Sequence, residues 1–409
     1  MIENARWLAA GFLLTFMSSF GQTYFIALFS GQIRGELGLS HGEFGTVYGL
    51  ATLSSAVALI WVGKLADREN TQLVAVFVCI MLAAGAFGMT IVTGPVVLFF
   101  TIFVLRLFGQ GMMTHVSQTA IGRWFVARRG KALAVTGFGF PTSEAVLPAI
   151  VVLLVGAAGW RSVWMMAVAV LLLVAAPVFW FLLGKGRTPL AANAVATGRG
   201  TAAPRNWTRH EVVRDRLFYL VMLGVLAPPF VGTGIFFHAV HLMETKGYDI
   251  TVFAGSFPIY AAVSVGSSFI AGWSVDRWSA RQFLPLTILP MGLGALVLAF
   301  GTVPATVTVA MVLFGFTAGF QSTTAAALWP EVYGTRHLGA IRALAMSAMV
   351  FASAASPYVL GTLIDRGVPF DNQLVVMAAY MMAATAVLVI VSLRLQRRAT
   401  VDLEPQVCV

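Results

Sequence analysis

Arg106 and Glu144 are charged residues that lie well inside long apolar segments of the sequence. Each lies roughly ten to thirteen residues from the start of its segment, which is about 15–20 Å along a helix. An ionisable side chain at this depth in a membrane is costly and is a functional candidate by default. A guanidinium can attract an anionic substrate, and a carboxyl group can exchange a proton. The sequence therefore predicts substrate binding by Arg106 and proton coupling by Glu144.

The same two residues could form an ion pair, because their segments are neighbours in the sequence. A static pair would only fix helix packing, and buried ion pairs are poor stabilisers on balance. A pair that opens would couple two events, since protonating Glu144 would free Arg106 for a carboxylate. Either form of pairing requires the two side chains to lie close together.

A polar stripe accompanies Arg106 along its segment. Gln110, Thr114 and Gln118 follow it at intervals of four residues, which places them on one face of an α-helix. His115 is nine residues from Arg106 and lies on the opposite face of a straight helix. We therefore place Arg106 and Gln110 toward a substrate cavity and interpret His115 as a packing histidine.

Residues 226–242 combine helix-breaking residues with two histidines. Pro228 and Pro229, with the nearby glycines, predict a broken helix, which is where substrate sites form in transporters. His238 and His241 are three residues apart and titrate near neutral pH. They are candidates for a proton relay, for substrate contacts or for an interface. Metal binding is poorly supported, because two histidines lack a carboxylate partner.

Composition indicates that most of the chain does not face water. Hydrophobic residues make up 59% of the 409 residues and charged residues 10%, against about 25% in soluble domains. The two cysteines exclude a disulfide framework. We find no metalloprotease, serine-hydrolase, nucleotide-binding or dinucleotide-binding motif, so neither an enzyme nor a cofactor is predicted. A non-transporting membrane enzyme or assembly factor is the competing class.

Twelve apolar segments are long enough to span a membrane, where about 20 residues are needed. A polar, arginine-containing stretch separates the first six from the last six. We predict domain limits of 1–184, a flexible cytoplasmic linker over 185–216, a second half over 217–393 and a tail over 394–409. The segments are 7–29, 44–62, 73–93, 96–121, 132–156, 162–184, 217–242, 251–271, 283–300, 304–328, 343–363 and 373–393.

Basic residues gather in alternate loops. With the N-terminus inside, the inner loops and the linker hold most of the lysines and arginines, as the positive-inside rule requires. This predicts a multi-pass protein of the cell inner membrane with both termini in the cytoplasm. The net charge of +10 is then a topology signal, and nucleic acid is excluded as a partner.

The two halves repeat a short motif at an offset of 209 residues. GKLADR (63–68) corresponds to GWSVDR (272–277), so that Gly63, Asp67 and Arg68 match Gly272, Asp276 and Arg277. Gly130 and Gly339 match at the same offset, as do Pro148 and Pro357. Chance explains one such pair in an apolar chain but not five. Two repeated six-span halves are a transporter architecture.

With this motif in both halves, the sequence resembles the major facilitator superfamily along its whole length. The family motif has a glycine, then Asp-Arg, a second glycine and basic residues between spans two and three. Asn70 and Ser279 replace the second glycine here, while the second copy keeps Arg281. RLFGQG (106–111), GRWFVARRG (122–130) and WPEVYGTRHLG (329–339) are similar to the monocarboxylate and oxalate–formate branch. That branch often carries charges in span eight, which residues 251–271 lack.

The resemblance implies a fold and a set of site residues. The fold is all-α and integral to the membrane, with twelve helices in two pseudo-symmetric six-helix halves. Spans one, four, seven and ten line the cavity in this family. Polar residues of spans one and ten therefore join the candidate site residues, although such residues also form routine contacts between helices. The predicted substrate-binding residues are Gln22, Tyr24, Arg106, Gln110, His238 and Gln321, with Glu144 and His238 for proton coupling.

The repeated motif predicts an ionic latch at the cytoplasmic surface, formed by Gly63, Asp67, Arg68, Asp276 and Arg277. The aspartates can cap helix N-termini, where the helix dipole favours anions, or pair with Arg123, Arg128 or Arg342. The alternative is a plain solvated turn.

The function that these residues predict is secondary active transport of a small, monocarboxylate-like organic anion by proton-coupled symport. A monomer in the lipid bilayer, with protons as coupling ions, is expected. The alternative is an exporter of drugs or amphipathic metabolites by proton antiport, which would need no cationic anchor.

Overall fold

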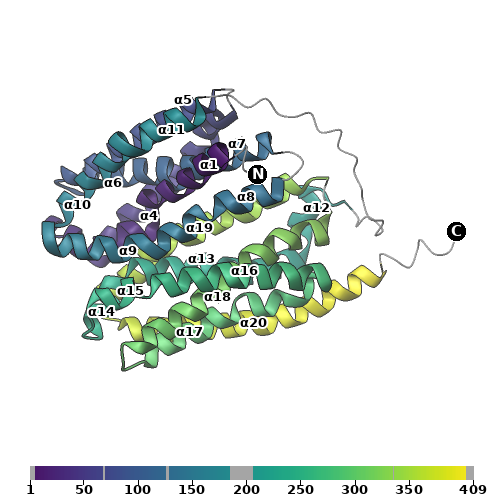
Figure 1. The fold of residues 1–409 in the computed structure, drawn as a ribbon. Coiled ribbons are helices and arrows are strands. Elements are labelled where there is room, and N and C mark those ends of the chain that lie inside the picture. The colour runs from purple at the N-terminus through teal and green to yellow at the C-terminus, as the bar shows by residue number, and fades with distance from the viewer. Residues whose placement is uncertain (1–4, 68–69, 126–128, 185–205, 335, 402–409) are drawn as a thin grey trace. The chain divides into compact units, whose positions relative to one another are not determined.

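The structure is a computed structural model that describes residues 5–67, 70–125, 129–184, 206–334 and 336–401. The regular elements of these residues are helices (Figure 1). This confirms the predicted all-α class. Arg68 and Arg128 lie outside the described residues, and nothing is described of the side chain of Asp67.

The membrane spans agree with the apolar segments of the sequence. Eleven described helices are long and apolar enough to cross a membrane, and a bent pair of helices at the start brings the number to twelve. The bent pair is Ala5–Ala27 with Ser30–Leu37, at 64°. The other spans are His41–Ala66, Thr71–Thr90, Pro95–Trp124, Lys131–Ala158, Trp160–Leu183, Arg216–Phe237, Ile250–Arg277, Ala280–Phe300, Ala305–Tyr333, Leu338–Asp365 and Phe370–Arg398.

Several spans are built from more than one helical element. The N-terminal six spans contain α1 (Ala5–Met17), η2 (Ser18–Gly21), α2 (Thr23–Ala27), α3 (Ser30–Leu37), α4 (His41–Val62), η3 (Gly63–Asp67), α5 (Thr71–Thr90), α6 (Pro95–Leu105), η4 (Arg106–Met113), α7 (Thr114–Trp124), α8 (Arg129–Gly137), α9 (Gly139–Ala158), α10 (Trp160–Ala169), η6 (Val170–Ala175) and α11 (Ala176–Leu183).

The remaining elements begin in the predicted linker. They are α12 (Arg209–Arg214), α13 (Arg216–Phe237), α14 (Ala239–Thr245), α15 (Ile250–Gly255), α16 (Phe257–Arg277), η7 (Ala280–Thr287), α17 (Leu289–Phe300), α18 (Ala305–Tyr333), α19 (Leu338–Asp365) and α20 (Phe370–Val401).

The predicted break at Pro228 and Pro229 is wrong in position. Helix α13 continues through both prolines to Phe237, and the chain leaves the helix only at His238. Prolines are tolerated in membrane helices because neighbouring groups satisfy the backbone that they leave unpaired.

The chain forms two compact units. The first unit contains Met1–Ala196, Phe236–Pro258 and Pro357–Asp365, and the second contains Thr197–Ile235, Ile259–Ser356 and Arg366–Val409. The predicted limits at 184, 216 and 393 stay a prediction.

In the first unit, α5 packs against α6, α10 and α11 (Figure 1). Arg6 joins the start of the first span to the end of the sixth, because its Nε and Nη2 donate to the carbonyls of Leu182 at 2.9 Å and Phe181 at 2.8 Å. The first and sixth spans therefore begin and end at the same side of this unit, as an even number of crossings requires.

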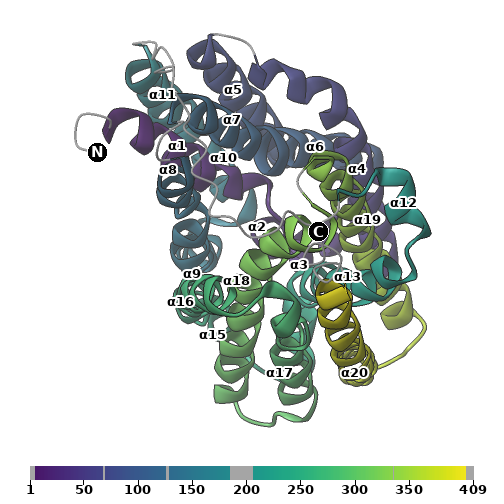
Figure 2. The same ribbon diagram turned by 90° about the vertical axis from the view of Figure 1, so that its right-hand side faces the viewer.

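In the second unit, α17 packs against both α18 and α20 (Figure 2). The end of the predicted linker makes contacts within this unit. Trp207 N donates to the Tyr333 carbonyl at 2.9 Å, and Arg398 Nη1 donates to Asp215 Oδ2 at 2.8 Å. The guanidinium of Arg398 also lies 4.0 Å from the centroid of the Trp207 ring. These contacts attach residues 207–215 to the ends of α18 and α20.

The first span loses its α-helical form where it crosses the fourth. Ser18–Gly21 form a 3₁₀ turn, and Gln22 is extended, with φ −86° and ψ 154°. The segment opposite, η4, is a π-helix, a form that often marks functional sites. A Cβ on Gly21 would overlap the Leu105 carbonyl and lie 2.7 Å from the Gly109 Cα. Two irregular backbones therefore touch directly, which requires glycine on both sides.

We expect Gly21→Ala to destabilise the protein, because the new methyl group would meet backbone rather than a side chain that can move. Overpacking of this kind costs about 1–3 kcal/mol. Thermal unfolding in detergent is the measurement. Gly266→Ala in α16 is the control, because a Cβ there meets nothing within 4 Å. Equal melting temperatures for Gly21→Ala and the unmodified protein would contradict the direct backbone contact.

Candidate functional site

Arg106 lies at the crossing of the first and fourth spans. Arg106 is the first residue of the π-helix η4, and it is 2% exposed. Its Nη1 donates to the Gly21 carbonyl at 3.2 Å and to Thr23 Oγ1 at 3.2 Å. The helix break explains this contact, because a carbonyl outside a regular helix needs another donor in a water-poor region.

Tyr48 of α4 completes the surroundings of the guanidinium. The Arg106 Cζ lies 5.4 Å from the centroid of the Tyr48 ring, within cation–π range. The Tyr48 hydroxyl donates to Thr23 Oγ1 at 2.7 Å. The hydroxyl of Thr23 therefore accepts from both side chains and fixes them relative to the helix break.

The charge of Arg106 is not balanced by a carboxylate. Among the described residues, Arg106 forms no ion pair within 4.0 Å, and its buried Nε has no hydrogen-bond partner. The ion pair between Arg106 and Glu144 that the sequence made possible is therefore absent. The backbone break supplies the reason, since the guanidinium is occupied by a carbonyl and a hydroxyl that the sequence pattern does not reveal.

Glu144 lies in α9 and is 5% exposed. In the described part of the chain it forms no hydrogen bond or ion pair, although its charge acts on the hydroxyl of Tyr24. Ser143 beside it bonds to Ser19 of the broken span, and the Tyr24 hydroxyl lies 3.3 Å from Ser143 Oγ. Glu144 therefore adjoins a hydroxyl cluster that leads to the same helix break as Arg106.

The two predicted glutamines near this crossing differ in exposure. Gln22 is half-buried at the extended residue of the break, and Gln110 is exposed on η4. The polar stripe that begins at Arg106 was predicted for an α-helix, whereas the backbone hydrogen bonds of a π-helix join residues i and i+5. Spacing by four therefore does not keep successive polar residues on one line of η4.

His238 and Gln321 have other contacts. His238 is 3% exposed in the first unit, and its Nε2 lies 3.3 Å from the Pro357 carbonyl. Gln321 belongs to the second unit, where its Nε2 donates to the Val225 carbonyl at 3.4 Å. The structure thus brings Gln22, Tyr24 and Arg106 together around the helix break and gives His238 different neighbours.

The second copy of the repeated motif adjoins a carboxylate that the sequence analysis did not single out, and the predicted ionic latch stays a prediction. Asp276 and Arg277 are exposed at the end of α16. The carboxylate of Glu331 accepts from Ser279 and from Ala280 N at 2.9 Å, and its Oε1 lies 2.9 Å from Arg281 Nε. Glu331 therefore caps the N-terminus of η7, a role that sequence reasoning missed, although WPEVYG was noticed.

Arg123 and Arg342, two proposed partners of the aspartates, contact backbone. Arg123 Nη2 donates to the Ala66 carbonyl at 3.2 Å, and Arg342 Nη2 donates to the Ala326 carbonyl at 2.6 Å. Gly63 is buried, and a Cβ there would lie 3.6 Å from His115 Nε2. Within the described ranges, no group of three or more His, Cys, Asp or Glu residues has an arrangement that could hold a metal ion.

Comparison with known proteins gives one family and several relatives. The model of the Major Facilitator Superfamily matches residues 11–357. A probable sulfoacetate transporter of Cupriavidus necator is 25% identical over 366 residues, or 83% of this chain and 82% of that protein. A probable L-galactonate transporter of Escherichia coli is 28% identical over 207 residues, or 47% of this chain and 44% of that protein.

Solved structures share the fold at low sequence identity. A bacterial homologue of the human lysosomal transporter Spinster, in an inward-facing and unoccupied conformation, has a TM-score of 0.74 and 15% identity, over 96% of this chain and 98% of that one. A D-xylose–proton symporter has a TM-score of 0.66 and 16% identity, over 95% of this chain and 97% of that one. The predicted transporter fold is thereby confirmed.

We expect Glu331→Ala to lower thermal stability in detergent, because it leaves the Nε of Arg281 and the first amide of η7 without the carboxylate that they contact. The loss of such partly buried contacts costs about 1–3 kcal/mol. Asp276→Ala is the matched control, since this exposed carboxylate forms no ion pair among the described residues, and its effect should stay within about 0.5 kcal/mol. A larger loss of stability in Asp276→Ala than in Glu331→Ala would show instead that the aspartate of the motif makes the important charge contact.

Proposed function

The chain belongs to the Major Facilitator Superfamily, and on that premise we propose that it is a secondary active transporter of a small organic anion. The substrate crosses the cell membrane by alternating access, in which two halves rock around a central site. We place both termini in the cytoplasm, because the basic residues gather in the loops of that side. The transporter works as a monomer.

One observation carries the substrate class, namely the buried and unbalanced charge of Arg106. Taking a cation out of water is costly unless a counter-charge or good hydrogen bonds replace the lost solvent. The side chain has its backbone and hydroxyl contacts on Nη1, whereas Nε has none. A carboxylate or sulfonate can accept from guanidinium N–H groups in parallel. An anionic substrate therefore supplies both the missing acceptor and the missing charge.

The names of the relatives support the same class. The transporters of Cupriavidus necator and Escherichia coli are named for sulfoacetate and L-galactonate, which are organic anions. We extend this class to the present chain, with a monocarboxylate-like anion as the substrate. Kinship to the monocarboxylate and oxalate–formate branch rests on the sequence motifs alone.

Proton coupling is assigned to Glu144. Its carboxyl group is 5% exposed, and such a group is more easily kept in a membrane when neutral. The hydroxyls of Tyr24, Ser143 and Ser19 connect its position to the helix break that holds Arg106. Proton uptake by Glu144 thus occurs beside the anion site without direct pairing to the guanidinium. His238 is the second candidate for the coupling residue.

Uptake of labelled anions into proteoliposomes tests the substrate class. We expect Arg106→Ala to weaken apparent affinity for the anion about 10- to 100-fold, the range for losing a hydrogen bond to a charged group. Arg106→Lys should recover part of it, since the charge remains but the planar set of donors is lost. The panel contains sulfoacetate, galactonate and short monocarboxylates.

The control for this experiment is Arg366→Ala, which removes an exposed arginine and should leave uptake unchanged. No uptake of any anion, or an Arg106→Ala variant that transports like the unmodified protein, would contradict the proposal. Uptake of neutral amphipathic compounds by that variant would instead favour an exporter of drugs or amphipathic metabolites.

A second measurement isolates the coupling residue. In Glu144→Gln we expect an inward proton gradient to lose its stimulation of net uptake, because the amide cannot bind the proton. Exchange of labelled for unlabelled anion at equal pH should persist, since exchange needs no net proton movement. His238→Gln is the comparison. If only His238→Gln lost the stimulation of uptake by the proton gradient, His238 would be the coupling residue.

A further inference from the structure

The N-terminus of α4 is capped by a carboxylate from α19. Asp365 accepts from Ser40 Oγ at 2.7 Å, from His41 N at 3.0 Å and from Gly42 N at 2.8 Å. Both segments belong to the first unit. The first turn of a helix carries unpaired N–H groups and the positive end of the dipole. Asp365 therefore stabilises a contact between two spans that are far apart in the sequence.

The same two helices touch along their backbones below this cap. A Cβ on Gly45 would overlap the carbonyl of Pro357, and a Cβ on Gly361 would lie 2.5 Å from the carbonyl of His41. Because glycines on both helices permit this approach, α4 and the Pro357–Asp365 part of α19 lie in direct contact at this end of the first unit. It is the end opposite to the one at which Arg6 meets α11, and the extracellular end in the predicted orientation.

Three histidines gather beside the cap. The ring of His41 lies 4.4 Å from that of His241 and 5.8 Å from that of His238, measured between centroids. A narrow gap beside these rings is lined by Ser30 and Arg34 of α3 and by two phenylalanines. The sequence predicted roles for His238 but did not place His41 next to it.

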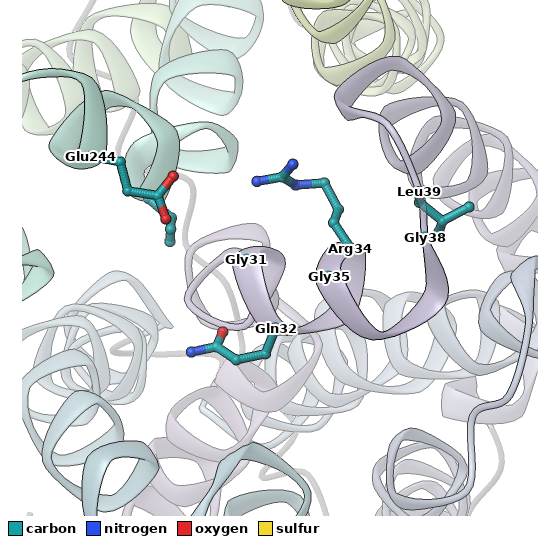
Figure 3. Close-up of a pocket in the computed structure, with 8 residues that line it drawn as sticks. Gly31, Gln32, Arg34, Gly35, Gly38, Leu39 and Glu244 are labelled. Carbon is teal, nitrogen blue, oxygen red and sulfur yellow. The ribbon is translucent and has the colours of Figure 1, made fainter.

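An open cavity of about 480 Å³ adjoins this gap. Figure 3 shows Arg34 and Glu244 pointing toward one another across it, with Gln32 below. The charges that act on the three histidines come from Arg34, Glu244 and Asp365 and from the histidines themselves. Asp249, on the neighbouring turn, bonds to Thr251 N at 2.8 Å at the start of its own helix.

We propose that Asp365 and the histidines His41, His238 and His241 form a proton-operated latch, which holds this end of the transporter closed when the histidines are neutral and releases it when they are protonated. The proposal rests on alternating access, as given in the proposed function, because both ends of such a transporter must open in turn. It adds a device that controls one end and needs no contact with the substrate.

The direction of the effect follows from the charges around this gap. Arg34 and His41 come from α3 and α4, and His238 and His241 come from the N-cap and the first turn of α14. When the histidines are protonated, Arg34 and His41 are each repelled by His238 and by His241. The added attractions are that of His41 for Asp365 and that of His241 for Glu244, which are two against four repulsions. Repulsion therefore exceeds attraction, and burial of the charged rings opposes closure further. Low pH favours the open state.

Cysteine labelling of the purified protein in detergent tests this latch without any substrate. Ser30→Cys, in a background without Cys79 and Cys408, places a thiol at a buried position that lines the histidine gap. Thr93→Cys supplies an exposed reference thiol, whose labelling corrects for the pH dependence of the maleimide reaction. The quantity measured is the ratio of the two labelling rates.

We expect this ratio to rise about threefold or more between about pH 7.5 and about pH 5.5, which brackets the ordinary pKa of histidine. In a variant with His41→Gln, His238→Gln and His241→Gln together, the ratio should not change with pH. Asp365→Asn should raise the ratio at every pH, because the charged cap is lost while the histidines remain. His337→Gln, outside the cluster, is the matched control and should behave like the parent protein.

Two results would overturn the latch. One is a ratio that is independent of pH in the parent protein. The other is a pH dependence that survives in the triple histidine variant but disappears in Glu144→Gln, which would assign the effect to the proposed coupling residue. Since the readout is opening and not uptake, failure of the anion proposal leaves this result interpretable.

Discussion

The hydrogen bond from Arg106 to the carbonyl of Gly21 is the interaction on which the centre of the first unit depends. The first span leaves its helical path at Ser18–Gln22, which frees backbone groups in a region where water is scarce. The long side chain of an arginine can donate a hydrogen bond to such a carbonyl where no backbone N–H group is close enough. Its approach needs the contact of Gly21 with Gly109, so that the break, the π-helix and the buried arginine form one arrangement.

This arrangement explains why the charge is kept and why it is left without a carboxylate. Pairing with Glu144 would neutralise the cation and remove the electrostatic basis of the anion binding that we propose. Contacts with a carbonyl, a hydroxyl and the face of Tyr48 hold the guanidinium in place while they leave its net charge intact. An arginine suits this role better than a lysine, because its planar group can bond to the protein on one edge and to a ligand on another.

The sequence was sufficient for the spans and insufficient for the contacts. Twelve apolar segments predict twelve crossings because the bilayer sets a minimum length for each, and every segment has a helical counterpart. The partners of Arg106 were not predictable, since one is a carbonyl that becomes available only when another helix unwinds. The same limit applies to Glu331 and Asp365, whose acceptor roles depend on amides of distant helices. By contrast, the prolines at 228 and 229 gave a false signal, because a membrane helix can accommodate them.

A common physical device appears at both of these acidic residues. Glu331 caps the start of η7 in the second unit, and Asp365 caps the start of α4 in the first. A carboxylate at a helix N-terminus gains about 0.3–2 kcal/mol from the dipole, which is enough to bias a conformation and too little to lock it. Such contacts suit a protein whose helices must separate and meet again in each cycle. Because the strength of a cap depends on the charges near it, protonation of the histidines beside Asp365 can change the stability of that cap.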